Sequence, residues 1–299
     1  MTETIKNRYD FVMLIDCTYG NPNGDPDANN MPRVDPETGI GLITDVCIKR
    51  KIRDYVDTVR AGEKGYGIYI KSGSSLQSKD QQALDYIRTA KVEKGKESQA
   101  IIDFMTSNYF DIRTFGAVMT TFSKKPKTDE EKKAAWSCGQ VTGPVQITFA
   151  QSIDPVTPMD LSVSRCAVTT EEDAEQKAST FGNKPIIPYG LYRAEGYISA
   201  ALAEKVTGFS EDDLELLWEA INGMFDTDHA AARGKMVLRD LIVFKHDNKF
   251  GCCPSHKLFD LVDVHKKDSV EFPRSYSDYV VTIDEEKIPE GVHLEHHNV

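Results

Sequence analysis

The chain has 299 residues, of which 40% are hydrophobic, 9% aromatic and 28% charged, and this balance is typical of a globular protein. No apolar run approaches the eighteen residues that a membrane-spanning helix needs, and the segment MTETIKNRYD lacks the apolar core of a signal peptide. We therefore expect a cytoplasmic location and no membrane partner. The net charge of −11 argues against general binding of polyanions, so any nucleic-acid contact needs a local basic cluster.

The cysteines do not form a metal-binding or redox motif. They are scattered, without a CxxC pair, and two adjacent cysteines cannot form an unstrained disulfide. We expect free thiols, no metal and no cofactor. The six positions are Cys17, Cys47, Cys138, Cys166, Cys252 and Cys253.

The N-terminal part predicts a strand, a long loop and a helix. The apolar run Phe11–Cys17 is typical of a buried strand, and residues 18–41 are too rich in Asn, Pro, Gly and Asp for a regular element. Thr44 is a good N-cap for a helix that extends to about Val59. Ile48, Ile52, Tyr55 and Val59 share one face of this helix, and we expect Lys49, Arg50 and Arg53 together on another.

Strands and helices alternate along the rest of the chain and predict an α+β protein. We expect helices at Gln81–Ala90 and Ser98–Asn108, inside a polar insertion, and after Ser210, where Asp213 completes a capping box. The expected strands or extended segments are Asp111–Thr121, Val141–Gln151, Leu161–Val168, Ile187–Ala200, Val237–Phe244 and Asp278–Ile283.

The acidic loop raises the question of a metal site. Asp25, Asp27 and Asn29 match the first three ligand positions of a calcium loop, but Asn30 and Pro36 stand where that loop needs Gly and Glu. The same carboxylates remain an alternative site for magnesium and phosphodiester cleavage, although Asx and Pro residues also shape tight loops without any ligand. HExxH, Walker A and GxSxG motifs are absent, so we do not expect an enzyme.

Basic residues gather at three places: Lys49, Arg50 and Arg53; Arg113; and Arg233 with Lys235. Each place borders a predicted strand end or a glycine-containing loop, where phosphate groups often bind. They line one face only if the strands are neighbours, which the sequence leaves open. The segment around Phe115 is a loose match to the aromatic signature of RNA-recognition folds, and Phe115 fits a core position equally well.

Five segments together carry a family resemblance. They are GNPNGDPDANNMPRVDPETGIGLITDVCIKRKIR (20–53), DIRTFGAVMTT (111–121), GQVTGPVQ (139–146), IIPYGLYRAEGYIS (186–199) and AARG…LIVFKH (231–246). In this order they resemble the backbone subunit of type I-C CRISPR Cascade, in the Cas-seven (Csd-two) family. The resemblance covers nearly the whole chain.

The resemblance implies a modified RNA-recognition, ferredoxin-like palm with a helical fingers insertion and a β-hairpin thumb. The palm would comprise residues 1–60, 111–153 and 187–299, the fingers 61–110 and the thumb 154–186. Copies would stack head to tail along guide RNA (crRNA), whose bases pair with target DNA. Other Cascade subunits, including the guide-processing and large subunits, would be further partners.

The resemblance also implies site residues. The family pattern of a Ser or Thr followed by a basic pair, which contacts the guide backbone, matches Thr44, Lys49 and Arg50, with Arg53 one turn on. Further candidates for RNA contact are Asn21, Asn23, Arg33, Arg113, Gln140, Arg165, Arg233 and Lys235, and Met159 and Phe181 are candidates for a thumb wedge. Two alternatives stay open: a metal-dependent ribonuclease that uses Asp25 or Asp27, as in type III relatives, and a monomeric RNA-binding regulator.

Overall fold

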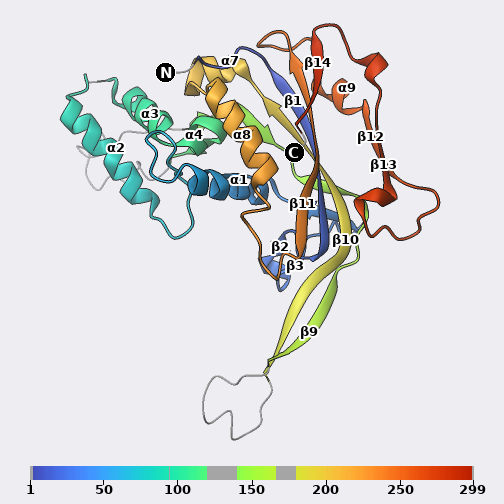
Figure 1. The fold of residues 1–299 in the computed structure, drawn as a ribbon. Helices are drawn as coiled ribbons and strands as arrows, with labels where there is room; N and C mark the ends of the chain where they lie inside the picture. The colour runs from blue at the N-terminus through green and yellow to red at the C-terminus, as the bar shows by residue number, and fades with distance from the viewer. Residues whose placement is uncertain (1–2, 94, 120–139, 166–179, 298–299) are drawn as a thin grey trace, which may run out of the picture.

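A computed structural model describes residues 3–93, 95–119, 140–165 and 180–297. Its centre is an antiparallel sheet in the order β14-β11-β1-β10-β8-β4, in which β10 also pairs with β7 and β9 (Figure 1). The strands are β1 (Tyr9–Gly20), β4 (Ile40–Ile43), β7 (Val145–Ile147), β8 (Ala150–Pro155), β9 (Met159–Arg165), β10 (Thr180–Ile198), β11 (Lys235–His246) and β14 (Val292–His296).

Strand β1 is the middle of the sheet and is covered on both faces. Phe11, Met13 and Ile15 belong to the hydrophobic cluster on one face, and Val12 and Leu14 belong to the cluster on the other. A strand that is buried on both sides has no polar face, which explains the continuous apolar run of its sequence. The predicted strand here is confirmed.

Two helices, α1 (Asp45–Val59) and α8 (Glu211–Gly223), cover one face of the sheet. Thr44 caps α1 through its side chain, and Ser210 and Asp213 form the predicted capping box of α8. Trp218 of α8 meets Phe11 edge to face, with the ring centroids 5.3 Å apart. Both helix starts are therefore confirmed.

A helical lobe extends from this layer, with its own small core. It contains α2 (Leu76–Ala90), α3 (Glu97–Asn108) and α4 (Phe110–Phe115), so the two helices predicted in the polar insertion are confirmed. The buried carboxylate of Asp111 ties the lobe to α1, because it accepts hydrogen bonds from the Tyr69 and Ile70 amides (2.7 and 3.0 Å) and from Arg53 Nε (2.8 Å).

The prediction of a strand at Asp111–Thr121 is wrong for residues 111–115 and confirmed for Gly116–Val118; residues 120 and 121 lie outside the described ones. The segment forms α4 and then the short strand β5 (Gly116–Val118), which pairs with β6 (Gln140–Thr142). Phe110, Ile112 and Phe115 are all buried, and packing around this one helical turn overrides the strand propensity of its β-branched and aromatic residues. Gly116, at a φ of +78°, ends the helix.

The strand predicted at Val141–Gln151 is broken into β6, β7 and the start of β8. The first break falls at Gly143 and Pro144. A Cβ atom on Gly143 would lie 2.2 Å from the carbonyl carbon of Phe115, so two backbone segments touch here and the regular ladder cannot continue.

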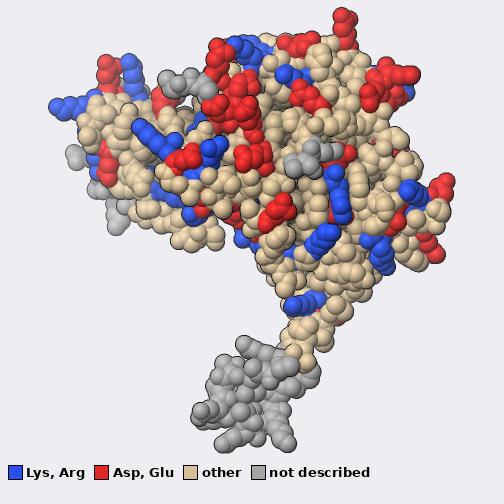
Figure 2. Space-filling view, viewed as in Figure 1, with Lys and Arg blue, Asp and Glu red and all other residues tan. Residues whose placement is uncertain are grey.

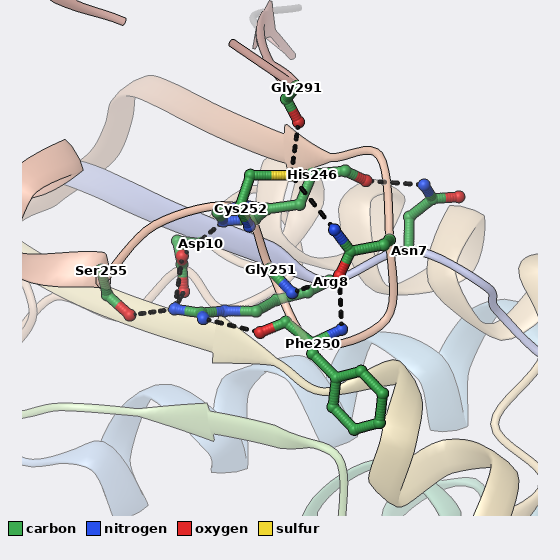
Figure 3. A network of polar contacts seen from close by, with 10 residues as sticks. Asn7, Arg8, Asp10, His246, Phe250, Gly251, Cys252, Ser255 and Gly291 are labelled. Atoms are coloured by element: carbon green, nitrogen blue, oxygen red, sulfur yellow. Dashed lines mark hydrogen bonds and ion pairs between the residues drawn. The ribbon is translucent and has the colours of Figure 1, made fainter. Parts of the chain in front are cut away.

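The other face of the sheet is covered by the hairpin of β12 (Val262–Lys266) and β13 (Tyr279–Ile283) and by α9 (Ser255–Phe259). Figure 3 shows the polar network that closes the loop between β11 and α9. His246 Nδ1 accepts a hydrogen bond from the Cys252 amide (2.9 Å), so Nε2 carries the ring proton and donates to Asp10 (2.9 Å). Arg8 completes the network by pairing with Asp10.

Strands β9 and β10 form a hairpin that projects from the sheet (Figure 1). The strand predicted at Leu161–Val168 is confirmed to Arg165; its last three residues lie outside the described ones, as do Cys138 and Cys166. The other cysteines are free thiols.

Within the described ranges, no helix is long and apolar enough to span a membrane. The remaining short elements are β2 (Gly24–Asp25), β3 (Met31–Pro32), η1 (Pro26–Ala28), α7 (Ala200–Leu202), the π-helical turn η2 (Ala203–Thr207), η3 (Tyr276–Asp278) and η4 (Glu285–Lys287).

Candidate nucleic-acid interface

A pocket of 290 Å³ opens where the loop after β1, helix α1 and the loop before β11 meet. Three cationic side chains, Arg50, Lys51 and Arg233, share it with one carboxylate, Asp228. The full lining is Asn21, Pro22, Asn23, Gly24, Asn30, Cys47, Arg50, Lys51, Asp228, Ala232 and Arg233. In a protein of net charge −11, this is a local excess of positive charge.

The loop after β1 is held in place by its asparagines. Asn21 binds the loop before β11 through its amide (2.9 Å to Ala232 O) and binds Asn30 O through its side chain (2.6 Å). Asn23 Oδ1 accepts hydrogen bonds from the amide and the hydroxyl of Thr44 (2.9 and 3.0 Å). The loop is thereby fastened to the start of α1, which places the second turn of that helix against the pocket.

The cations of the pocket are crowded and partly desolvated. Lys51 is buried and pairs with Asp228. Burial, with the neighbouring charges of Arg233 and Arg50, lowers the pKa of Lys51 to about 8. Burial, together with the neighbouring charge of Arg50, also lowers the pKa of Arg233. Burial raises the pKa of Cys47, so its thiol stays neutral and adds no negative charge.

Such a pocket favours an anion. Arg50 is open to solvent, with 60% of its side chain exposed and an ion pair to Asp54 at 3.5 Å. Arg233 is 30% exposed, pairs with the Asp228 carboxylate and also hydrogen-bonds Asp228 O at 2.9 Å. An incoming phosphate would relieve the repulsion among these cations and accept their N–H groups. The pocket is open at the surface and has no aromatic side chain among its lining residues, so it suits a sugar-phosphate backbone better than one particular base.

The structure brings together four of the residues predicted from sequence, namely Asn21, Asn23, Arg50 and Arg233, and adds Lys51. Sequence reasoning missed Lys51, although it stands inside the KRKIR run. It follows Ile48 by three positions and precedes Tyr55 by four, which places it at the edge of the apolar stripe. A lysine at such an edge can bury its stem and present its ammonium to a pocket.

Arg53 and Arg113 lie in buried ion pairs. The prediction that Arg53 shares an exposed face with Lys49 and Arg50 is wrong, because Arg53 is 8% exposed and pairs with Asp111, which is 1% exposed. Arg113 makes two hydrogen bonds to Asp213 (2.8 and 2.7 Å) and lies over the Tyr66 ring. Both arginines hold the helical lobe against the sheet layer, so we do not carry them forward as RNA contacts.

Three further predicted residues are engaged locally. The hydroxyl of Thr44 bonds Asn23 and caps α1. Lys49 pairs with Asp45 at 2.9 Å and lies over the Phe115 ring, and Arg33 pairs with Asp25 at 3.3 Å. Phe115 itself is a core residue.

The remaining predicted residues lie outside the pocket. Gln140 is exposed on β6, and Lys235 is exposed at the start of β11. In the ladder of the β9–β10 hairpin, Arg165 pairs with Thr180 and Phe181 pairs with Ser164. Met159 is half-buried at the base of that hairpin, opposite Ile186.

The hairpin presents an apolar stripe that sequence reasoning missed. Leu161 and Val163 are 44% and 39% exposed, and they alternate with Met159 along β9, so the three side chains share one face of the strand. The alternating pattern Met-x-Leu-x-Val in the sequence could have predicted this stripe.

The acidic loop is held by internal contacts. Asp25 Oδ1 accepts the Asp27 amide at 3.1 Å, and Oδ2 pairs with Arg33. Among the described residues, no group of three or more His, Cys, Asp or Glu side chains is placed to hold a metal ion.

Figure 2 shows how charge is divided over one face. Acidic side chains gather near α7 and the start of α8, and lysines and arginines lie over the helical lobe and, lower, near β11 and the projecting hairpin. Acidic side chains are therefore not spread evenly over the face in view.

Fold and pocket together define a mixed α/β protein, built on an antiparallel sheet, with a basic pocket suited to phosphate groups. The chain belongs to the family of CRISPR-associated protein Cas7, whose family model matches residues 7–284. It is 25% identical, over 295 residues, to a CRISPR-associated protein Cas7 of Haloferax volcanii, and the match covers 94% of this chain and 82% of that protein.

The chain is also similar to two chains of solved structures. One comes from a "CRISPR RNA-guided surveillance complex, pre-nicking" and matches with a TM-score of 0.49 and 13% identity over 79% of this chain and 78% of that chain. The other comes from a "CRISPR RNA-guided surveillance complex" and matches with a TM-score of 0.44 and 13% identity over 79% of this chain and 68% of that chain.

Proposed function

We propose that this chain is a non-catalytic backbone subunit of a type I-C Cascade surveillance complex in the cytoplasm, and that it binds the sugar-phosphate backbone of crRNA. One observation carries the proposal: Arg50, Lys51 and Arg233 converge on one surface pocket, with a single carboxylate between them. Membership of the Cas7 family supports it.

The mechanism follows from electrostatics. Each phosphate that enters the pocket is neutralised by guanidinium and ammonium groups, and counterions are released from the RNA. Affinity then depends on salt and hardly on base sequence. The bases stay available to pair with target DNA, so the guide RNA reads the target sequence and the protein does not.

We infer that the sheet core is a modified RNA-recognition, ferredoxin-like palm. The strand order β11-β1-β10-β8, with α1 after β1 and α8 between β10 and β11, supports this inference. The helical lobe would be the fingers (61–110) and the β9–β10 hairpin part of the thumb (154–186). Copies would stack head to tail, with the guide-processing and large subunits as further partners.

The apolar stripe of the hairpin supports its role as a thumb. Leu161 and Val163 are exposed beyond Met159 on a projecting element, where an apolar wedge could enter between bases. We therefore add both residues to Met159 and Phe181 as wedge candidates.

The ribonuclease alternative is tested by one variant. Both oxygens of Asp25 are engaged inside the loop, which supports a structural role. Assembled protein with guide RNA, complementary RNA and magnesium should give no regularly spaced cuts. Cuts that disappear in Asp25→Ala would favour the nuclease.

The proposed RNA site is tested by salt-dependent binding of single-stranded RNA. In Arg50→Ala with Arg233→Ala, the slope of log affinity against log salt should fall by about 0.7 for each phosphate that the protein no longer neutralises. The matched control is Arg88→Ala in α2, because Arg88 is 64% exposed and pairs with Asp85 much as Arg50 pairs with Asp54. Equal slopes in wild type, double variant and control would contradict the proposal.

A further inference from the structure

Tyr19, near the end of β1, combines exposure with backbone strain. Its φ is +45°, in the left-handed region, which a residue with a bulky side chain rarely adopts. Its side chain is 61% exposed, so burial of the ring does not offset the strain. Within the described ranges, the ring makes no ring-ring or cation–π contact and the hydroxyl makes no hydrogen bond.

The neighbouring backbone explains why the strain falls at this position. A Cβ atom on Gly234 would lie 2.3 Å from the carbonyl oxygen of Tyr19, and one on Gly20 would lie 1.9 Å from Arg233 O. The end of β1 and the loop before β11 are therefore in direct backbone contact. On the other side, the pairs Thr18↔Tyr189 and Gly20↔Ile187 leave Tyr19 outside the ladder with β10.

A glycine would fit this backbone without strain. An exposed aromatic side chain at a strained position, without a ring contact or hydroxyl hydrogen bond to the described residues, indicates a role outside the fold.

The position of Tyr19 identifies the kind of partner. Two residues later, Asn21 lines the basic pocket, and its amide bonds Ala232 beside Arg233. On the β10 side, its neighbour Gly20 pairs with Ile187, which follows the residue where the β9–β10 hairpin leaves the sheet. The backbone of Tyr19 is thus placed between the proposed phosphate site and the proposed thumb.

We propose that Tyr19 is a stacking platform for one base of the RNA strand whose phosphates occupy the basic pocket. The proposal rests on the proposed function and deepens it, because it adds a base contact to a backbone contact. An exposed tyrosine ring stacks on any base and so preserves sequence tolerance. It also avoids hydrogen bonds to the base edges, which stay free for pairing.

The experiment compares two strands, a single-stranded oligoribonucleotide and an abasic ribose-phosphate strand of equal length and charge. With the full chain, Tyr19→Ala should weaken binding of the oligoribonucleotide by about 5- to 100-fold, and Tyr19→Trp should restore it. Both variants should bind the abasic strand as wild type does. The salt slope should stay unchanged, since no charged contact is removed.

Tyr19→Gly guards against a folding artefact, because glycine adopts the observed φ freely. It should match wild type in thermal unfolding and still lose the base-dependent binding. Equal affinity of Tyr19→Ala and wild type for the oligoribonucleotide would overturn the proposal, and so would equal losses on both strands. Loss of self-association with unchanged RNA binding would likewise overturn it, by assigning the ring to a contact between copies.

The two proposals fail in different ways. If wild type binds no RNA, or binds it without salt dependence, the proposed function fails. If wild type binds with a steep salt slope and Tyr19→Ala binds equally well, only the stacking proposal fails.

Discussion

Arg50 and Arg53 stand less than one turn apart on α1, and the structure assigns them opposite roles. In Arg53→Ala we expect loss of stability without loss of RNA affinity. The side chains of Arg53 and Asp111 are 8% and 1% exposed and meet at 2.8 Å. Removal of one partner from a buried pair costs about 3–5 kcal/mol, because the other charge stays buried.

The lower end of that range applies to Arg53→Ala. Asp111 keeps two backbone donors, the amides of Tyr69 and Ile70, so its carboxylate is not left unsatisfied. A loss of about 3 kcal/mol should lower the melting temperature by about 6–12 °C in a protein of this size. In Arg50→Ala, whose side chain is 60% exposed, the free energy of unfolding should change by less than about 0.5 kcal/mol.

The assay pairs thermal unfolding, followed by circular dichroism, with RNA titrations at a temperature where both variants are folded. Arg53→Ala should melt early and bind RNA normally, and Arg50→Ala should melt normally and bind RNA weakly. The reverse pattern, a normally melting Arg53→Ala with weakened RNA binding, would refute the placement of Arg53 in the interior.

Three other predictions follow from single contacts. Burial lowers the pKa of Lys51 to about 8, and a bound phosphate favours its ammonium form, so RNA affinity should fall by about tenfold from pH 7 to pH 9. Lys51→Arg should abolish this pH dependence. An RNA affinity of the wild type that does not change with pH would contradict the prediction. Gly143→Ala forces a Cβ atom to within 2.2 Å of backbone and should cost about 3 kcal/mol in denaturant unfolding. In the control Gly182→Ala, the new Cβ atom lies 3.6 Å from Val163, an ordinary contact, so this variant should be neutral. His246→Ala leaves the Cys252 amide without its acceptor and should lower stability by about 2 kcal/mol; an unchanged melting curve would show that the network adds nothing.

Local signals predicted much of the fold. The β1 strand, the caps at Thr44 and Ser210, and the helices of the lobe all follow from patterns within a few residues. Such patterns depend on side-chain periodicity and capping chemistry, which act before any tertiary contact forms.

Errors arose where distant segments decide the outcome. The segment after Tyr109 is helical where its apolar side chains pack in the interior. Its Asp111 also accepts hydrogen bonds from the Tyr69 and Ile70 amides, more than forty positions away along the chain, and such distant contacts leave no local sequence pattern. The basic run on α1 likewise did not show which of its cations face the pocket, because Asp111 and the loop before β11 lie on distant segments. Arg53 forms an ion pair with Asp111, and Lys49 forms one with Asp45. Arg50 and Lys51 line a pocket together with the loop before β11.

The central claim is that the pocket at Arg50, Lys51 and Arg233 holds RNA phosphates. A reconstruction by electron cryomicroscopy of the chain assembled on guide RNA would test it most directly. The account predicts phosphate density in the pocket, within hydrogen-bond distance of the Arg50 and Arg233 guanidinium groups. An RNA path that crosses another face and leaves these side chains in contact only with solvent and their present partners, Asp54 and Asp228, would contradict it.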